Sequence, residues 1–534
     1  MLQKETTAAA ATAAAGSKPD LQIERLLQFG VQRGLLEPLD VIPARNALLD
    51  LFRLAEPFGG EVPEERLDSA VEVLEVLLDY AAASGMLEAD TLTHRDLLDA
   101  RIMGLLMPRQ SEVVRQFWRT AEESGIEAAT SDYYRFSTDS NYIRMDRIRK
   151  NQYWLTNTEY GDLEITVNLS KPEKDPKEIA LLKTVQQSNY PACLLCVDNV
   201  GYAGRLNHPA RQNHRIIPLT LVDEPWNFQY SPYVYYNEHS IIFHNEHVPM
   251  KLTPATFARL LDFLDRFPHY FIGSNADLPI VGGSILNHDH FQGGRHQFAM
   301  ERAESEAFFS HRDFPGVKAS IVKWPMSVVR MSGSDKEELL KLAALVFEQW
   351  QGYSNPMLDI AAFTETDGGK IPHNTVTPIA RRNTQGEYEI DLVLRNNRTS
   401  EEHPDGIFHP HQDLHHIKKE NIGLIEVMGL AVLPGRLKDE LQQISAFLTG
   451  QAVLSDDIRK DASHPLNKHS DWISSMVSSY GTSLSAAEAE EMLRGEVGRK
   501  FLNVLKDAGV YKQDAPGRAA FRRLMVHMGF EEKA

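Results

Sequence analysis

The sequence predicts an α+β protein with mainly antiparallel sheets, because helix-like and strand-like patterns occupy separate stretches of the chain. Apolar residues recur at helical spacing near the N-terminus, as in Val71, Leu74 and Leu78. The middle of the chain consists of short β-rich runs separated by Pro, Asn and Gly, and the C-terminal part turns helical again. At 534 residues the chain also exceeds what one hydrophobic core usually supports, so several structural units are expected.

These patterns divide the chain into five expected regions. The first is an Ala- and Thr-rich tail that is expected to be disordered. The five regions are the tail at 1–19, an N-terminal helical unit at 20–129, a strand-rich half at 130–300, a second strand-rich half at 301–437 and a C-terminal helical unit at 438–534. The two helical units carry no chemical motif, so support and assembly are the expected roles.

Local signals predict individual elements. Thr253 can cap a helix, Pro254 suits its first turn, and Pro268 ends it. A second helix is expected to open at the capping pair Ser334 and Glu337. Strands are expected within residues 240–247, 319–331 and 388–395.

Composition and charge narrow the class of protein. The chain is 42% hydrophobic and 24% charged, as ordinary globular proteins are. With 56 basic and 74 acidic residues its formal charge is −18, which argues against a nucleic-acid partner. It has neither a run of about 18 apolar residues nor a secretion signal, so we expect a cytoplasmic protein without a membrane partner.

One short array can carry chemistry by itself. His288, His290 and Gln292 form an H-x-H-x-Q pattern after the small residues Gly282, Gly283 and Ser284. If 279–291 runs extended, the period-two alternation of a strand sends the two imidazoles and the amide to one face. Imidazole attacks phosphorus or binds metals near neutral pH, and glycines let backbone N–H groups approach phosphate oxygens. The alternative is a surface strand that happens to hold two histidines.

The segment around this array resembles the active-site segment of the class II, bacterial galactose-1-phosphate uridylyltransferases, which belong to the histidine-triad superfamily. The similarity extends over about residues 130–440. Its segments are Ala276–Gly294 (ADLPIVGGSILNHDHFQGG), Ser140–Arg144, Asn168–Ala180, Gly201–Arg215 and His415–Leu437.

The resemblance implies a fold and an activity. The two strand-rich halves would be histidine-triad-like, with the active site in the first. The activity would be that of a UDP-glucose–hexose-1-phosphate uridylyltransferase of galactose metabolism, a nucleotidyltransferase without an organic cofactor and with a homodimer as its expected assembly. His290 would attack the α-phosphorus of UDP-glucose and become uridylylated, so kinetics with galactose 1-phosphate would be ping-pong. A backbone carbonyl near His288 is the natural partner for the other ring nitrogen of His290.

Two other functions stay open. One is a different histidine-triad nucleotidyltransferase or hydrolase, which would release a nucleotide to water or phosphate. The other is a catalytically dead regulator that binds nucleotide sugars, against which the intact H-x-H-x-Q array speaks.

The resemblance also suggests roles for polar residues near the array. Gln292 stands where hydrolytic members of the superfamily have a third histidine. An amide can hold a phosphoryl oxygen but cannot protonate a leaving group, which favours transfer. Asn275 and Ser284 lie just upstream and would contact phosphate.

The two cysteines of the chain, Cys193 and Cys196, are spaced C-x-x-C. In a reducing cytoplasm such a pair favours a zinc site over a disulfide. By resemblance to the class I enzymes, His247 and His288 would complete a tetrahedral zinc site, which two thiolates and two imidazoles suit. His244 is an alternative to His247, and a metal-free packed pair is the alternative to zinc.

Basic residues within the family segments are candidates for binding the diphosphate. Guanidinium groups match phosphate oxygens in pairs, and Arg144 and Arg205 are our choices, with solvated surface charge as the alternative. Glu426 resembles a residue that contacts the hexose, although a glutamate facing water is the competing interpretation.

A second array, His409-Pro410-His411, is interpreted as second-half substrate or metal chemistry or as a polar loop, and His415 and His416 share that ambiguity.

Overall fold

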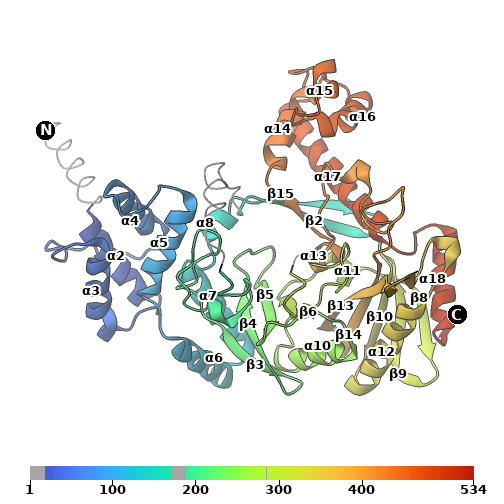
Figure 1. Cartoon of the computed structure of the whole chain (residues 1–534), viewed down its shortest axis with the longest axis horizontal. Coiled ribbons are helices and arrows are strands. Elements are labelled where there is room, and N and C mark those ends of the chain that lie inside the picture. The colour runs from blue at the N-terminus through green and yellow to red at the C-terminus, as the bar shows by residue number, and fades with distance from the viewer. Residues whose placement is uncertain (1–17, 171–187, 284, 534) are drawn as a thin grey trace. The chain divides into compact units, whose positions relative to one another are not determined.

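The computed structural model describes residues 18–170, 188–283 and 285–533 (Figure 1). Most of the predicted disordered tail, and part of the 168–180 segment, lie outside these residues. The described chain is α+β, as the sequence predicts, and its described strand pairs are antiparallel except for one. It forms two compact units, one drawn from 1–149, 172–234 and 240–248 and the other from 150–171, 235–239 and 249–534.

The first unit begins with helices. They are α2 (Pro19–Gln32), α3 (Val41–Phe52), α4 (Val71–Ala83), α5 (Leu92–Gly104), α6 (Gln110–Ser124), α7 (Ile126–Asp139) and α8 (Met145–Ile148). The periodic residues Leu74 and Leu78 point into a core shared with α2, α3 and α5. The unit continues with an antiparallel meander of β3 (Ile217–Leu221), β4 (Glu224–Tyr230) and β5 (Ser240–His244). The helical region thus runs past residue 130, because α7 crosses it.

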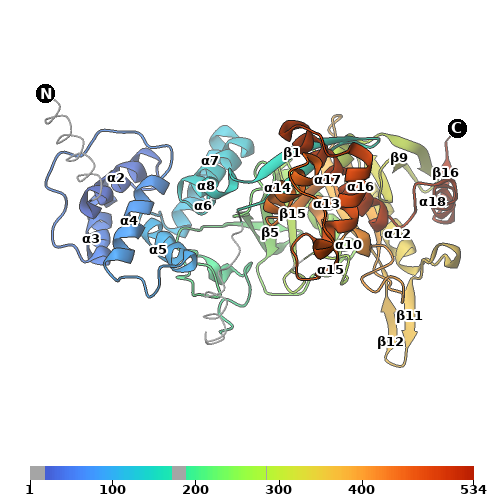
Figure 2. The same cartoon turned by 90° about the horizontal axis from the view of Figure 1, so that it is seen from above.

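The second unit is built on two sheets. In the larger one the strands follow the order β16 (Phe530–Glu532), β8 (Ser305–His311), β9 (Phe314–Val322), β10 (Val328–Gly333), β14 (Tyr388–Asn396), β13 (Asn374–Arg382), β6 (Phe271–Gly273) and β7 (His290–Gly294). The smaller sheet has the order β1 (Gln152–Thr158), β2 (Gly161–Asn168) and β15 (Leu430–Pro434), with β15 parallel to β2. A separate hairpin of β11 (Phe363–Thr366) and β12 (Gly369–Pro372) projects from the sheet (Figure 2).

Helices cover both sheets. Those of the second unit are α10 (Pro254–Arg266), α11 (Ala299–Arg302), α12 (Lys336–Gly352), α13 (Leu424–Val427), α14 (Leu437–Leu448), α15 (Asp456–Lys460), α16 (Ser470–Tyr480), α17 (Ala486–Ala508) and α18 (Ala515–His527). Helices α10 and α12 contact β13 in the larger sheet, and α17 contacts β1 and β2 (Figure 1). No described helix is both long and apolar enough to cross a membrane.

The predicted helix at 254–266 is confirmed, whereas the predicted cap of the next helix is wrong. Helix α10 starts at Pro254 and buries an apolar face that includes Phe257 and Leu261. Helix α12 is capped by Asp335 and not by Ser334: the Asp335 carboxylate accepts the N–H groups of Glu337 and Glu338 at 2.9 and 3.0 Å. A charged carboxylate at a helix N-terminus accepts more strongly than a hydroxyl, so it displaces the serine one residue earlier.

The predicted extended run at 279–291 is also wrong in its extent, because the strand begins only at His290. Ile280 adopts φ 71°, and the N–H of Val281 donates to the carbonyl of Pro279 at 2.8 Å. This is a γ-turn with positive φ, a strained arrangement for a β-branched residue. His288 is therefore reached through irregular backbone, and only His290 and Gln292 share a strand.

One buried histidine of the first unit makes its stability depend on pH. His214 is 3% exposed, stacks on Tyr142 with ring centroids 4.1 Å apart, and donates Nε2–H to Gln229 Oε1 at 2.9 Å. Burial, reinforced by nearby Arg211, lowers the pKa of His214 to about 3. The folded pKa lies below the unfolded value, so this stabilisation is complete above pH 6.5 and is lost as the pH falls below it.

We therefore expect His214→Phe, which keeps the ring stacking, to flatten the acid limb of the stability curve. Between pH 6.5 and 5.5 the free energy of unfolding, measured in urea, should fall by about 1 kcal/mol less in the variant than in the wild type. The exposed His527 provides the control, since His527→Phe should follow the wild-type curve. An unchanged pH slope in His214→Phe would contradict the assignment.

Candidate active site

Two polar residues of the H-x-H-x-Q array, His290 and Gln292, project from strand β7. β7 pairs with β6 in a register that sets Gln292 opposite Gly273. Because side chains alternate along a strand, His290 and Gln292 point to the same face. His290 is 5% exposed, and Gln292 is half-buried.

His290 is held as a neutral imidazole with a defined tautomer. Its Nδ1 lies 2.8 Å from the backbone carbonyl of His288. A carbonyl can only accept, so Nδ1 carries the proton and Nε2 keeps its lone pair, as the sequence predicts. Burial lowers the pKa of His290 to about 4, and the hydrogen bond to the His288 carbonyl opposes this shift only in part. The ring is therefore neutral at pH 7, with the lone pair of Nε2 available.

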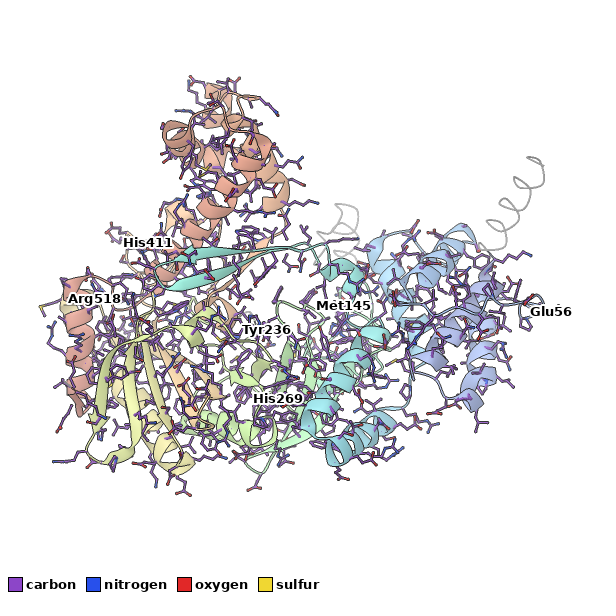
Figure 3. The ribbon with its side chains drawn as sticks, turned by 180° about the vertical axis from the view of Figure 1, so that it is seen from behind. Glu56, Met145, Tyr236, His269, His411 and Arg518 are labelled. Carbon is purple, nitrogen blue, oxygen red and sulfur yellow. The ribbon has the colours of Figure 1, made fainter. Side chains whose placement is uncertain are left out.

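Gln292 is oriented by a histidine that the sequence analysis missed. His239 Nε2 lies 3.1 Å from Gln292 Oε1, and the amide oxygen can only accept, so the Gln292 NH2 group is directed elsewhere. His239 is 4% exposed and packs on Tyr236, which is labelled in Figure 3, with ring centroids 4.5 Å apart. The Tyr236 hydroxyl in turn donates to the carbonyl of Gly293 at 3.1 Å.

The glycines before the array are required by close backbone approach. A Cβ on Gly282 would lie 2.6 Å from the carbonyl oxygen of Leu278, and one on Gly283 would lie 2.6 Å from Asn275 Nδ2. Neither contact is tolerable for a side chain. The small-residue run thus lets the loop fold tightly against Asn275, while Ser284 lies outside the described residues.

Asn275 and Glu426 are brought close together. Asn275 Oδ1 accepts the N–H of Leu424 at 2.8 Å, at the start of the short helix that carries Glu426. Glu426 is 9% exposed and ion-paired with Lys418 Nζ at 2.9 Å, so the interpretation that it faces water is wrong. Its other oxygen accepts the N–H of Gly423 at 3.2 Å.

The two arginines chosen from the sequence bind protein groups. Arg144 Nη1 and Nη2 donate to the two carboxylate oxygens of buried Asp99 at 3.1 and 3.2 Å. Arg205 donates to Asn207, to Tyr202 and to the carbonyls of Ser188 and Tyr190. Neither guanidinium offers its paired donors to a ligand in this conformation, so their role as phosphate-binding residues stays a prediction.

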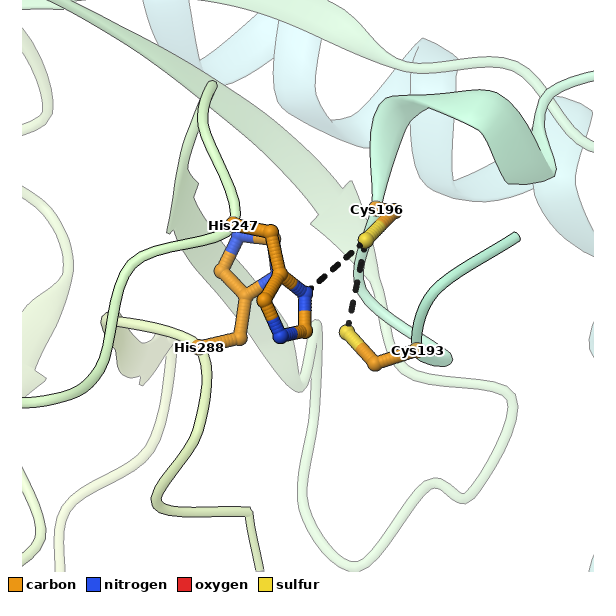
Figure 4. Close-up of side chains that lie close together, drawn as sticks. All are labelled: Cys193, Cys196, His247 and His288. Carbon is orange, nitrogen blue, oxygen red and sulfur yellow. Dashed lines mark hydrogen bonds between the residues drawn. The ribbon is translucent and has the colours of Figure 1, made fainter. Parts of the chain in front are cut away.

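The predicted metal ligands form a cluster that fits zinc (Figure 4). The ligand atoms of Cys193, Cys196, His247 and His288 all lie within 4.8 Å of one another. Cys196 Sγ is 3.6 Å from Cys193 Sγ and 3.2 Å from His247 Nδ1. Tetrahedral zinc would separate two sulfurs by about 3.8 Å and a sulfur from a nitrogen by about 3.5 Å. His244 is not part of this cluster.

The turn between the two cysteines is secured by a residue pair that the sequence analysis did not select. Asn199 Nδ2 donates to the carbonyls of both Cys193 and Cys196 at 2.8 Å. Its Oδ1 accepts from His208 Nε2 at 2.7 Å, and burial lowers the pKa of His208 to about 4. Neutral His208 thus fixes the side-chain amide of Asn199, which in turn fixes the turn between Cys193 and Cys196.

The second array does not form a metal centre. His411 Nε2 and His415 Nε2 donate to the backbone carbonyls of Ile407 and Pro410 at 3.1 and 2.8 Å, and His416 pairs with His469. Within the described ranges, no metal-ligating group of three or more residues includes any of these histidines. The metal interpretation of His409-Pro410-His411 is therefore wrong for the described chain, and His409 stands apart as a buried ring.

Comparison with known proteins identifies the family. The model of the galactose-1-phosphate uridyl transferase N-terminal domain matches residues 37–249, and that of the C-terminal domain matches residues 263–463. The chain belongs to the galactose-1-phosphate uridylyltransferase family. The resemblance drawn from the sequence is thereby confirmed.

Similarity to individual members extends over almost the whole chain. The galactose-1-phosphate uridylyltransferase of Caldanaerobacter subterraneus is 61% identical over 96% of this chain and 98% of its own length. Those of Halalkalibacterium halodurans and Bacillus subtilis are 54% and 50% identical, each over 95% of this chain and 98% and 97% of their own lengths. The solved yeast Ap4A phosphorylase Apa2 aligns at 12% identity over 63% of this chain and 90% of its own, with a TM-score of 0.29, too distant a likeness to argue from.

We expect purified protein to contain about one zinc ion per chain, because two thiolates and two imidazoles of this geometry bind zinc tightly. Cys193→Ser should lower the zinc content measured by atomic emission and lower the melting temperature. His244→Asn is the matched control and should retain the metal. Equal zinc content in both variants, or none in the wild type, would rule the site out.

Proposed function

We propose that this enzyme is a UDP-glucose–hexose-1-phosphate uridylyltransferase of galactose metabolism, working through a uridylyl-histidine at His290. The observation that carries the proposal is the buried, neutral His290, whose Nδ1 is fixed on the carbonyl of His288 so that Nε2 can attack. Membership in the family supplies the substrates, UDP-glucose and galactose 1-phosphate.

In the first half-reaction, His290 Nε2 attacks the α-phosphorus of UDP-glucose. A phosphorus–nitrogen bond forms, the phosphorus–oxygen bond to glucose 1-phosphate breaks, and that sugar phosphate leaves with the bonding electrons. The Nδ1 proton stays on the ring and donates to the carbonyl of His288, which stabilises the positive charge that develops on the ring. The leaving group is a stable anion, so no acid is needed.

In the second half-reaction, a phosphate oxygen of galactose 1-phosphate attacks the same phosphorus. The phosphorus–nitrogen bond breaks, UDP-galactose forms, and His290 returns to its neutral state. The Gln292 NH2 group, with its oxygen held by His239, binds a phosphoryl oxygen in both steps. Asn275 would support the phosphate, and Glu426 would accept hydrogen bonds from sugar hydroxyls.

The cluster of Cys193, Cys196, His247 and His288 takes no part in these steps. A zinc ion bound there would supply a structural link that fixes His288, whose carbonyl in turn fixes His290. The cysteine sulfurs, 3.6 Å apart, are not disulfide-bonded, in keeping with the cytoplasmic location that we propose.

Replacement of His290 by Ala should reduce the exchange of radiolabelled glucose 1-phosphate into UDP-glucose by at least about a thousandfold, because the nucleophile is lost. His290→Gly should recover part of the activity with added imidazole. His527→Ala, on the exposed face of α18, should retain full exchange. Mass spectrometry after incubation with UDP-glucose alone should find a uridylyl group on His290, and substantial exchange by His290→Ala would refute the assignment.

His239 is expected to be a positioning residue for Gln292. His239→Leu leaves the amide without its fixed partner, so the single-turnover rate of uridylyl-enzyme formation should fall about three- to tenfold, with little change in the KM for UDP-glucose. His239→Gln keeps an N–H donor and should recover most of the rate. A purely structural role predicts loss of stability in both variants and no such recovery.

A further inference from the structure

The face of the larger sheet that carries His290 also carries a buried arginine without a counter-charge. Residues that pair across neighbouring strands point to the same face of the sheet. Gln292 pairs with Gly273, Gly273 with Ile379, and Ile379 with Asp391. Side chains alternate between the two faces along a strand, so Thr377 and Thr375 share the face of Ile379 on β13. Arg395 likewise shares the face of Asp391 on β14. The side chains of Arg395 and His290 therefore project from the same side of the sheet.

The Arg395 side chain is anchored by one nitrogen only. It is 1% exposed, and its Nη1 donates to Thr377 Oγ1 at 3.2 Å and to the carbonyl of Ile422 at 2.9 Å. Among the residues that the structure describes, its Nε and Nη2 have no hydrogen-bond partner. These two groups form the parallel pair of donors that binds two oxygens of a phosphate or carboxylate.

A neighbouring arginine binds a carboxylate through the same pair of donors. Arg330 lies on the same face, opposite Asp391, and its Nε and Nη2 donate to the two Asp391 oxygens at 2.7 and 2.9 Å. Within the described ranges, the same donor pair on Arg395 is hydrogen-bonded to no carboxylate. Glu426, which acts on Arg395 from a distance, is already paired with Lys418.

Arg395 nevertheless keeps its charge. Burial lowers the pKa of Arg395 to about 10, which leaves it protonated at neutral pH. An unpaired buried cation is costly, so an anion is the natural complement. Lys418 has a second acidic neighbour in Glu420, at 4.0 Å, whose side chain is exposed.

His409 adds neutral polar groups beside this cation. It is 4% exposed, and within the described chain neither ring nitrogen makes a well-formed hydrogen bond. Burial, with a further contribution from Arg395, lowers the pKa of His409 to about 4. A neutral imidazole offers one donor and one acceptor, which suits a hydroxyl group next to an oxyanion.

We propose that Arg395, with His409 beside it, binds the phosphate monoester of a sugar phosphate through its Nε and Nη2 groups, with a sugar hydroxyl on the imidazole. The choice of a sugar phosphate rests on the proposed function, whereas the oxyanion itself rests on the geometry of Arg395. This site would hold the sugar 1-phosphate that leaves in one half-reaction and the one that attacks in the next.

Calorimetric binding of α-D-galactose 1-phosphate, inorganic phosphate and uncharged D-galactose tests the proposal. The titrations use full-length His290→Ala protein, so that binding is measured without uridylyl transfer. We expect both phosphates to bind more tightly than D-galactose. Arg395→Lys, which keeps the charge but loses the paired donors, should raise the Kd for galactose 1-phosphate about tenfold, and Arg395→Met should raise it further.

The stability of each variant separates a binding role from a structural one. Arg395→Met removes an unpaired buried charge, so its melting temperature without ligand should equal or exceed that of the parent, while its stabilisation by phosphate should disappear. Arg330→Lys, the matched control, should lower the melting temperature and leave the Kd unchanged.

An unchanged Kd in both Arg395 variants, or no binding of either phosphate by the parent, overturns the inference. If Arg395→Met fails to fold, Arg395→Lys decides the question alone. If the Arg395 variants lose phosphate binding but the protein that retains His290 shows no uridylyl exchange, the proposed function is refuted and this site stands.

Discussion

The hydrogen bond between His290 Nδ1 and the carbonyl of His288 is the contact on which the chemistry of this site depends. It forces the proton onto one nitrogen and leaves the lone pair on the other. The carbonyl can reach the ring because the chain joins the strand only at His290. The turn at Ile280 and the close contacts of Gly282 and Gly283 shape the approach to that point. The strain of this loop is the local cost of the arrangement.

The sheet gives a common orientation to groups that come from distant parts of the sequence. His290 and Gln292 on β7, Thr377 on β13 and Arg395 on β14 point to one face because each lies at the same parity in a continuous register. Short α13 completes this side, since Leu424 donates to Asn275 and the carbonyl of Ile422 accepts from Arg395. Antiparallel pairing thus combines both sequence halves into one surface.

Burial determines the protonation of the histidines near this site. His290 and His409 each have a pKa of about 4 because desolvation disfavours the charged ring. His208 follows the same rule and holds Asn199, which in turn holds the loop of Cys193 and Cys196. Neutral imidazoles therefore stand at the proposed nucleophile His290, in the scaffold of the cysteine loop and at the proposed oxyanion site.

The sequence by itself determined the α+β class and the helix at Pro254, because these follow from periodicity and spacing. Its resemblance to known sequences gave the family and the set of four metal-ligating residues, which the family models and the described cluster confirm. Tertiary structure decided the rest. It placed the cap of α12 on Asp335, since local acceptors compete for the same N–H groups, and it bound the Arg144 guanidinium to Asp99. It also brought His239 to Gln292, 53 residues away in the chain, and left Arg395 without a carboxylate partner among the residues that the structure describes. Such pairings depend on strand register and burial, which no local pattern of residues encodes.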